Sequence, residues 1–515
     1  MNGAKNGIGR IIPDELLAGA HGRLVPYGRE VSAAGRCAVR QAARGRKVVR
    51  DIKEAIRRSG LRDGMTISFH HHFRNGDFVL PMVLQAIDEM GIRDLTLAPS
   101  SLTDAHECVA DLAERGVVTT IHTSGVRGRV GQAISSGRIR NPVVIHSHGG
   151  RARALAEGSI RVDVAFIAAP ACDASGNLTG AIGPSACGSL GYAMVDARYA
   201  KHVVAVTDTL LDGPLPGRVS IPQYLVDQIA VVPSIGDPSK IATGATRITR
   251  DPLSLVIAEN AFRAIRASGL IAPGCSFQVG GGGASLAVAR YVREYMLEKK
   301  IRGSFGLGGI TASMAQMLSD DLFEVLYDVQ SFDAAVTESI ATNPRHVEID
   351  AAWYADPSAS GCLVDDLDVV VLAALDVDVD FNVDVLSGHD GVLRGASGGH
   401  CDTAAGAKLA VVVVPSFREG VPSIRDAVQT VVTPGETVDV IVTERGMCVN
   451  PRRPDLAEAF RAAGLRVTDI RELKERVERI TGVPRPVALD RDHPVGVVEY
   501  RDGSLIDTLY RVVSS

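Results

Sequence analysis

The chain has 515 residues, 46% of them hydrophobic and 22% charged, and a formal net charge of −5. This length predicts two domains rather than one core, and the charge carries no footprint of nucleic-acid binding. Aliphatic runs fall far short of the roughly 18 apolar residues that span a bilayer, no secretion signal opens the chain, and the eight cysteines form no CxxC pair. We therefore expect a cytoplasmic enzyme or enzyme subunit with reduced thiols and no structural zinc site.

Residues 1–50 are rich in Gly and Arg and contain no strand-like run, so they are expected to form an N-terminal extension. Arg36, Arg40 and Arg44 are four residues apart, and a helix there would carry a basic stripe. Such a stripe indicates either a solvated face or a docking surface for an acidic partner.

From residue 51 onward, short apolar runs alternate with amphipathic helical patterns. Runs that are hydrophobic on both faces and separated by helices favour parallel sheets covered on both sides. We therefore predict an α/β fold with two tandem open α/β/α domains, residues 51–240 and 241–515. The predicted strands are 65–69, 117–121, 142–146, 163–168 and 202–207, then 275–279, 368–375, 408–414 and 438–443.

Three consecutive histidines, His70, His71 and His72, follow the first predicted strand. Successive strand residues point to opposite faces, so all three could hold one metal ion only in a loop. A loop that contacts substrate or the other domain is the better interpretation. His146 and His148 could share a face, and we interpret them as structural.

Four glycines, Gly280–Gly283, stand between a predicted strand and a helical pattern. Backbone N–H groups at that position of an open α/β sheet bind anions. The loop therefore predicts a phosphate or carboxylate site, or else a turn that requires positive φ. Neither GxGxxG nor GxxxxGK[ST] follows a strand, which argues against a dehydrogenase or a P-loop ATPase.

The second half repeats parts of the first. AIRRSGL at 55–61 returns as AIRASGL at 264–270, and DVAFIAAPACD at 163–173 returns as DVVVLAALDVD at 368–378. In this register Asp376 stands where the first copy has Ala171. A duplicated scaffold with a carboxylate in only one copy predicts an internal duplication and one active site shaped by both halves.

The densest polar pattern begins at the end of the strand predicted over 368–375. Asp376, Asp378 and Asp380 alternate toward one face, and five glycines follow between residues 388 and 399. Carboxylates beside exposed backbone donors predict a site for acyl chemistry.

Two other motifs in this segment fit less well. A calcium loop starting at Asp376 would need Gly at Phe381 and Glu at Ser387. Gly395–Gly399 satisfies GxSxG, but no strand precedes it, as a serine nucleophile elbow requires. Further on, the apolar runs around Arg501–Ser504 predict a terminal hairpin that turns at Asp-Gly.

Together these segments resemble the family of bacterial citrate lyase α subunits, the citrate CoA-transferase component. The resemblance runs in order from about residue 50 to the end. The motifs are SFHHHFRNGD at 68–77, IHSHGGR at 145–151, DVAFIAAPACDASGN at 163–177, GGGGASLAVAR at 280–290, GLGGITASM at 306–314, DVQSFD at 328–333, DGVLRGASGGHCDTA at 390–404 and VTERG at 442–446.

The resemblance implies tandem domains of the CoA-transferase, NagB/RpiA-like type, whose active carboxylate lies in an Ala-Leu-Glu-x-Asp strand end followed by a Gly-Gly-x-x-Asp loop. Asp376 occupies the place of that Glu, and Gly398, Gly399 and Asp402 form the loop. Asp is shorter than Glu by one carbon–carbon bond, roughly 1.5 Å. Either the backbone compensates for this difference, or Asp376 does not attack covalently. The resemblance implies the second, a direct exchange of acyl groups between bound partners, and Asp376 is expected to orient groups or to act as nucleophile.

The implied reaction exchanges the acetyl group of an acetyl thioester for citrate, giving a citryl thioester and acetate. Arg394 is the first candidate to bind a citrate carboxylate, with Arg74 and Arg127 next. His72 and Asn382 complete the expected substrate contacts. Gly280, Gly281, Gly282, Gly283 and Ser285 are expected to hold the CoA-like arm.

The resemblance also implies a complex with a lyase β subunit and an acyl-carrier γ subunit, whose thioester arm acetyl-CoA could replace. No tightly bound cofactor or metal is expected for this step. Citramalate or acetate CoA-transfer, thioester hydrolysis, or an inactive assembly role on the same scaffold stay open as alternatives.

Overall fold

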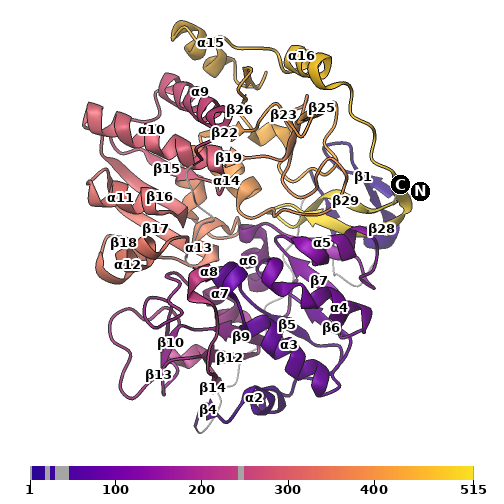
Figure 1. Cartoon of the computed structure of the whole chain (residues 1–515), viewed down its shortest axis with the longest axis vertical. Helices are drawn as coiled ribbons and strands as arrows, with labels where there is room; N and C mark the ends of the chain where they lie inside the picture. Colours follow the sequence, from indigo (N-terminus) through magenta and orange to yellow (C-terminus); the bar gives the residue numbers. More distant parts are fainter. Residues whose placement is uncertain (1–2, 18–23, 29–45, 242–248, 514–515) are drawn as a thin grey trace.

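The computed structural model describes residues 3–17, 24–28, 46–241 and 249–513, and two large sheets organise it (Figure 1). We call residues 51–241 the first half and 249–488 the second half. The first half contributes seven parallel strands in the order β8-β7-β6-β5-β9-β12-β14. In that order they span Val143–Ile145, Val118–Thr123, Leu95–Leu97, Thr66–Ser68, Val164–Ala168, His202–Thr207 and Gln228–Val231.

The second half builds its sheet in the same way. Its parallel strands follow the order β18-β17-β16-β15-β19-β22-β26, with antiparallel β27 at the edge. They span His346–Glu348, Phe323–Ser331, Gly303–Ile310, Ser276–Val279, Val369–Ala373, Leu409–Val413, Val440–Val442 and Met447–Val449. In both sheets the first strand of the half lies between the second and the fifth: β5 between β6 and β9, and β15 between β16 and β19. The predicted α/β fold with parallel sheets is confirmed.

Helices pack on both sheets and begin and end where the sequence caps them. The Asp51 side chain accepts from the Glu54 amide at the start of α2, and Asp251 accepts from Ser254 at the start of α9. The repeated Ser-Gly ends both helices, with Gly60 and Gly269 in the left-handed region. The helices of the first half are α2 Ile52–Ser59, α3 Val79–Glu89, α4 Cys108–Glu114, α5 Gly128–Ser135, α6 His148–Glu157, α7 Gly191–Tyr199 and α8 Pro238–Ile241.

The second half carries α9 and α10 on the outer face of its sheet, where they enclose a separate apolar core (Figure 1). The largest core runs through both halves instead, from Phe166 of β9 to Leu372 of β19. The helices of this half are α9 Pro252–Ser268, α10 Gly283–Lys299, α11 Ala312–Ser319, α12 Ala334–Thr342, α13 Ala351–Ala355, α14 His400–Gly406, α15 Pro454–Ala462 and α16 Ile470–Thr481.

A small three-stranded sheet follows the fifth strand of each half. In the first half β10 (Ala171–Asp173) pairs with β11 (Leu178–Thr179) and β13 (Leu210–Leu211). In the second half β20 (Asp376–Asp378), β21 (Val383–Asp384) and β25 (Ile424–Arg425) pair in the same sense. Strand β20 therefore presents Asp376 at the position where β10 presents Ala171.

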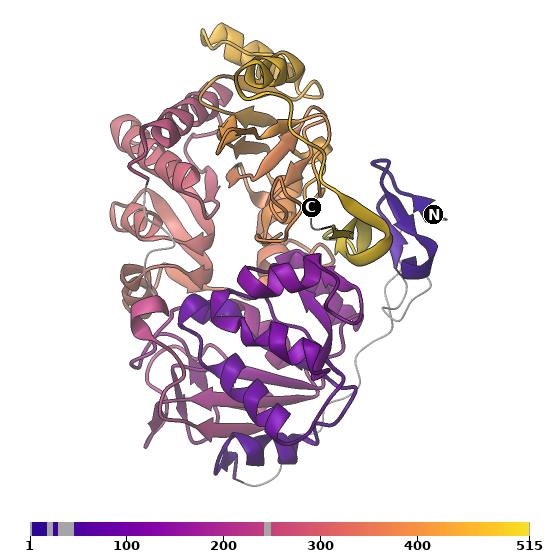
Figure 2. The ribbon, with the colours of Figure 1, turned by 45° about the vertical axis from the view of Figure 1, so that its right-hand side comes forward.

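The predicted terminal hairpin is present as β28 (Leu489–Glu499) and β29 (Ser504–Val512). It pairs with β8, so it extends the sheet of the first half, although the predicted boundaries attach it to the second. The extension also contributes strands: β3 (Val25–Pro26) pairs with β29 and β4 (Val48–Val49) with β14. Figure 2 shows the N-terminal elements, among them β1 (Gly3–Lys5), β2 (Ile11–Pro13) and α1 (Asp14–Leu17), beside this hairpin.

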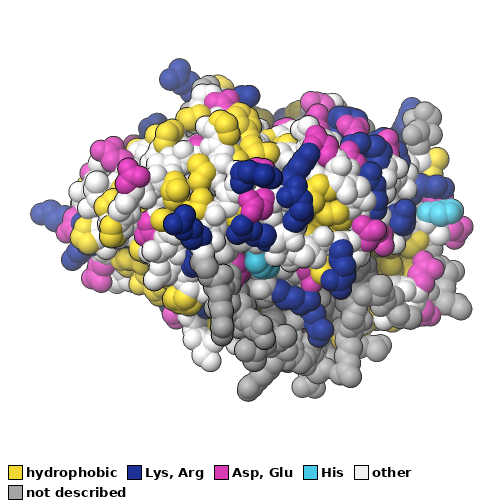
Figure 3. All heavy atoms as spheres, turned by 90° about the horizontal axis from the view of Figure 1, so that it is seen from below, with side chains coloured by type: hydrophobic (Ala, Val, Ile, Leu, Met, Phe, Trp, Pro, Cys, Tyr) yellow, Lys and Arg dark blue, Asp and Glu magenta, His cyan; other side chains and the backbone are white. Residues whose placement is uncertain are grey.

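The face of the molecule drawn in Figure 3 is mixed in charge. Seen from below, Lys and Arg side chains stand with Asp and Glu between them (Figure 3). No helix within the described residues is long and apolar enough to cross a membrane, and the seven cysteines in this part of the chain are free thiols. Arg36, Arg40 and Arg44, which predict a basic stripe, lie outside the described residues.

Candidate active site

A cavity of about 480 Å³ opens where the two halves meet. The first half supplies Arg127, His148 and Tyr192 to its wall. The second half supplies the carboxyl ends of β15, β16, β17 and β19, together with residues 394–400. Carboxyl ends of parallel strands are where open α/β sheets bind ligands, so the cavity lies where the fold places a site.

Two residues that line this cavity carry a buried polar atom without a hydrogen-bond partner in the described chain. These atoms are Gln278 Oε1 and His148 Nδ1. Buried polar atoms are almost always hydrogen-bonded in folded proteins. Gln278 Oε1 is therefore suited to accept a hydrogen bond from a polar ligand in the cavity.

The glycine-rich loop 395–399 is fastened to the first half through its backbone. Val126 N donates to Gly395 O at 3.0 Å, Ser397 N to Ser124 O at 2.7 Å, and His148 N to Gly398 O at 2.8 Å. Gly398 has φ +52°, a conformation that favours glycine. Within the described chain, the amides of Gly398 and Gly399 donate to no other group, and both residues line the cavity. Both glycines therefore present unpaired backbone donors at the cavity.

Asp402 ties the two halves together behind this loop. Its carboxylate accepts from Ser147 Oγ at 2.7 Å and from Gly149 N at 2.9 Å, at the start of α6 in the first half. Burial raises the pKa of Asp402 to about 6, against the opposing effect of Arg501 3.8 Å away. This geometry is that of a buttress for the loop.

Asp376 lies one residue beyond the cavity wall. Ala374 and Leu375 line the cavity, while the Asp376 carboxylate is buried and accepts from Arg425 Nη2 at 3.1 Å and Nε at 3.3 Å. Burial raises the pKa of Asp376, and the Arg425 guanidinium opposes that shift. The carboxylate is thus paired with a cation, and Asp376 is not among the described residues that line the cavity.

Arg394 and Arg127 stand at the cavity wall near solvent. The side chain of Arg394 is 44% exposed and forms an ion pair with Asp390. Arg127 is exposed at the start of α5. The first candidate for a citrate clamp is therefore already paired with a carboxylate.

Arg74 is a half-buried cation next to the cavity, although it is not among the described residues that line it. Its guanidinium lies 4.0 Å over the ring of Phe332, which lines the cavity, and Nη1 is buried with no hydrogen-bond partner in the described chain. Burial lowers the pKa of Arg74 to about 10. Its backbone has φ 53° and ψ −129°, a strained conformation for a side-chain-bearing residue. A desolvated, under-satisfied guanidinium is suited to bind a carboxylate.

The three consecutive histidines have three different partners. His70 Nε2 lies 3.1 Å from Asp196 Oδ2, His71 Nδ1 lies 2.7 Å from Ser100 Oγ, and His72 Nε2 lies 2.9 Å from Ala168 O. Only His71 reaches the neighbourhood of the cavity, through stacking with Tyr192 and His148. His72 is buried in the first half and is not among the described residues that line the cavity.

The remaining predicted contacts divide in a similar way. Gly280 and Gly281 line the cavity, whereas Gly282, Gly283 and Ser285 form the start of α10 outside its described lining. Asn382 holds the turn after β20, donating to Asp378 Oδ2 at 3.1 Å and accepting from Gly435 N at 2.9 Å. The side chain of Asn382 therefore stabilises the loop and does not line the described cavity.

Several wall residues were not identified from the sequence. Gln278 donates to Tyr354 Oη at 2.9 Å, and Arg418 Nη2 donates to Ala374 O at 2.8 Å. His148 was interpreted as structural. The feature of IHSHGG that could have identified His148 is its position. It follows a strand and precedes two glycines at the start of a helix, where open sheets place ligand contacts. No cluster of three or more possible metal ligands occurs in the described residues.

Comparison with known proteins agrees with the geometry. The family model for the citrate lyase alpha subunit matches residues 45–512. The citrate lyase alpha chain of Haemophilus influenzae is 50% identical over 472 residues, 92% of this chain and 94% of that relative. The structure of the citrate lyase alpha subunit from Streptococcus mutans in complex with citrate has a TM-score of 0.93 at 48% identity and covers 99% of this chain and 100% of that one.

A more distant structure shares the fold. An acyl-CoA transferase from Escherichia coli O157:H7, in a thioester complex with CoA, has a TM-score of 0.54 at 15% identity and covers 78% of this chain and 88% of that one. At this identity the likeness concerns the fold alone, which is that of a CoA-transferase.

Proposed function

The chain belongs to the family of citrate lyase α subunits, and from this we propose that it exchanges the acetyl group of an acetyl thioester for citrate, giving a citryl thioester and acetate. The observation that carries the proposal is the cavity between the halves, with the unpartnered Gln278 Oε1 in its wall and the guanidinium of Arg74 beside it, over Phe332. The likeness to a citrate-bound relative over nearly the whole chain supports citrate as the acyl acceptor.

In the proposed exchange, a citrate carboxylate oxygen attacks the acetyl carbonyl and the carbon–sulfur bond breaks, giving a mixed anhydride and a thiolate. The thiolate then attacks the citryl carbonyl and acetate leaves. Each step places negative charge on a carbonyl oxygen. The free amides of Gly398 and Gly399 are suited to stabilise it, and losing one such donor costs roughly 3–4 kcal/mol of barrier.

Arg74 is the proposed clamp for a citrate carboxylate inside the cavity, because its guanidinium is desolvated and lacks a full set of acceptors. Arg127 is the proposed second cation. Arg394 at the wall would have to leave Asp390 before it could bind substrate. His72 and Asn382 support the site through packing and turn formation in this proposal, without touching substrate.

Direct exchange is proposed over a covalent intermediate on Asp376. Its carboxylate is engaged by Arg425, and its neighbour across the strand pair is Asp384, whose pKa burial raises to about 7. A buried, paired carboxylate behind the wall would have to break an ion pair to attack a thioester. The proposed role of Asp376 is to hold β20, and with it the wall residues Ala374 and Leu375.

The thioester arm is proposed to enter along Gly280 and Gly281, with Gly282, Gly283 and Ser285 at the start of α10 beside it. It would arrive on an acyl-carrier subunit or as acetyl-CoA, with no other tightly held cofactor. The resulting citryl thioester requires a lyase that cleaves it, so we place the chain in a complex with carrier and lyase subunits. The free thiols favour the cytoplasm.

We also infer that the halves arose by internal duplication within the NagB/RpiA-like type. The shared strand order, the repeated helix ends and the matched small sheets support this inference. The proposed domains remain 51–240 and 241–515 after an extension of residues 1–50, with the terminal hairpin crossing back to the first.

A dual-label exchange assay tests the function. The full chain is incubated with acetyl-CoA and either labelled citrate or labelled acetate, and label in citryl-CoA and acetyl-CoA is followed. Label transfer from both acids is expected. Release of free CoA without label exchange would favour a hydrolase. Faster exchange with citramalate would favour that acid, and no reaction with any donor would favour an inactive assembly subunit.

A further inference from the structure

His148 belongs to the first half but lies beside Gly398 and Gly399 of the second half, which we call the diglycine turn. It is the first residue of α6, and its amide is fixed by Gly398 O at 2.8 Å. Residues on both sides of it, Ser147 and Gly149, are held by the Asp402 carboxylate. Three hydrogen bonds between the halves therefore position this one residue.

The imidazole of His148 is held by aromatic neighbours. Its ring centroid lies 4.4 Å from that of Tyr192 and 5.5 Å from that of His71. Its Nε2 lies 3.7 Å from the point that a Cβ on Gly398 would occupy. The ring lines the cavity, so Nε2 stands beside the amides that the proposed exchange uses.

The two ring nitrogens differ in their surroundings. Nδ1 is buried and has no hydrogen-bond partner in the described chain, whereas Nε2 is not closed off in this way. Nε2 is the ring nitrogen that a ligand in the cavity can reach, and in the tautomer protonated there it donates to that ligand. Burial, reinforced by Arg151, lowers the pKa of His148 to about 3, so the ring is neutral near neutral pH.

We propose that His148 is a further catalytic residue. Its Nε2–H donates to the acyl oxygen together with the amides of Gly398 and Gly399. This proposal rests on the exchange reaction proposed above. A bond forms between a citrate carboxylate oxygen and the acetyl carbonyl carbon, and the bond between that carbon and sulfur breaks. His148 keeps its proton throughout. The electron pair on the acyl oxygen returns to the carbonyl when the thiolate, and later acetate, leaves.

A neutral donor suits this role better than a general base. The exchange transfers no proton between citrate, thiolate and acetate. A base would also need a pKa near the operating pH, well above that of His148. His148 is fixed on the first half, and the amides of Gly398 and Gly399 belong to the second. Turnover by these donors together therefore requires that the two halves pack correctly against each other.

The test uses the full chain, acetyl-CoA and citrate, and compares His148→Leu, His148→Asn and His148→Gln. Gln can place an N–H near the position of Nε2, Asn only near that of Nδ1, and Leu has no donor. The kcat should fall about a hundredfold or more for Leu and Asn, with KM for citrate within about threefold. Gln should retain more activity than Asn by about tenfold.

A kcat for His148→Leu within about threefold of the wild type would overturn the proposal, as would equal losses in Asn and Gln or a change in KM alone. Circular dichroism and Tm identify a variant that does not fold. If Leu does not fold, the comparison of Gln with Asn decides, because both are polar and differ in where the N–H lies. A wild type without exchange would instead remove the proposed function.

Discussion

Asp402 links its ionisation to folding, because its carboxyl is buried between the halves. Its pKa lies at about 6 in the folded chain and near the ordinary 3.8 in the unfolded one. Between these values the folded state binds more protons, so the contribution of this group to stability falls as pH rises. The loss begins near the unfolded pKa and ends above the folded one.

Replacing Asp402 by Asn removes this titration. The free energy of unfolding of the wild type minus that of Asp402→Asn should be largest below about pH 4, decrease from about pH 4 to 6, and stay level above. Urea unfolding at a series of pH values measures this difference. An increase with pH across the window would contradict the assignment.

Asp111→Asn provides the matched control. A hydrogen bond from Arg129 lowers the pKa of the exposed Asp111, so its contribution to stability rises slightly up to about pH 5 and is constant above, where the group is ionised in both states. The free energy of unfolding of the wild type minus that of Asp111→Asn should therefore not decrease over the same window.

At this scale the sequence predicted residue types better than roles. The Gly398–Gly399 pair and Asp402 could be identified because they follow a recognisable motif. Arg394 attracted attention because it lies next to that motif, but Asp390, four residues earlier, neutralises it. Arg74 was ranked lower because its burial under Phe332 joins residues that are far apart in the chain.

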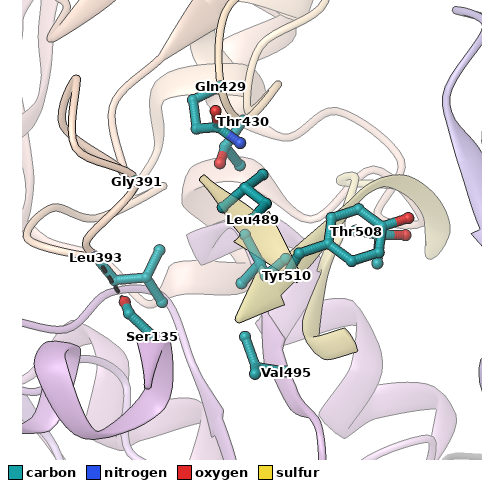
Figure 4. Close-up of a pocket in the computed structure, with 10 residues that line it drawn as sticks. Ser135, Gly391, Leu393, Gln429, Thr430, Leu489, Val495, Thr508 and Tyr510 are labelled. Atoms are coloured by element: carbon teal, nitrogen blue, oxygen red, sulfur yellow. Dashed lines mark hydrogen bonds between the residues drawn. The ribbon is translucent and has the colours of Figure 1, made fainter. Parts of the chain in front are cut away.

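Among the elements, α5 and the loop before the diglycine turn pack without space between them. A Cβ on Gly131 would lie 2.1 Å from Leu393 O. Leu393 N donates to Ser135 Oγ at 2.9 Å, and Figure 4 shows both residues beside Leu489 and Tyr510 of the terminal hairpin. The loop that leads to the site thus rests on a helix of the first half and on the hairpin.

Gly131→Ala should separate α5 from this loop. The overlap with a backbone oxygen should cost about 1–3 kcal/mol of stability and lower kcat, because residues 395–399 move with the loop. Tm and the exchange assay report the two effects. Gln132→Ala on the exposed side of the same helix is the control, and equal behaviour of the two variants would contradict this view of the contact.

Elements with continuous apolar runs, such as β19 and β22, were predictable from sequence alone. Strand β16, Gly303–Ile310, was not assigned because four of its eight residues are glycine, which removes the apolar pattern. The hairpin was predicted from its turn. Its pairing with β8 was not, since strand register across more than three hundred residues leaves no local signal.

In the whole molecule, the end of the chain is secured by a buried ionic group. Glu499 of β28 accepts from Arg153 Nη2 at 2.7 Å and lies 3.0 Å from His146 Nδ1, all three side chains being buried. Breaking a buried pair by removing one partner is costly because the other charge stays in the interior.

Glu499→Ala should therefore lower the free energy of unfolding by about 2–3 kcal/mol, less than the roughly 3–5 kcal/mol of a fully uncompensated buried charge, because Arg153 keeps its ion pair with Glu157. Glu472→Ala, which removes an ion pair with Arg476 at the surface of α16, should cost less than about 1 kcal/mol. Chemical denaturation of both variants makes the comparison. Equal losses of unfolding free energy in the two variants would contradict a stabilising role of the buried ion pair between Glu499 and Arg153.

The seating of β28 against β8, with β3 alongside β29, has a consequence for biosynthesis. Strand β8 is synthesised more than three hundred residues before β28, so its edge stays unpaired in the growing polypeptide until β28 follows. Because an unpaired strand edge can pair with another molecule, this edge is where the nascent protein is open to association.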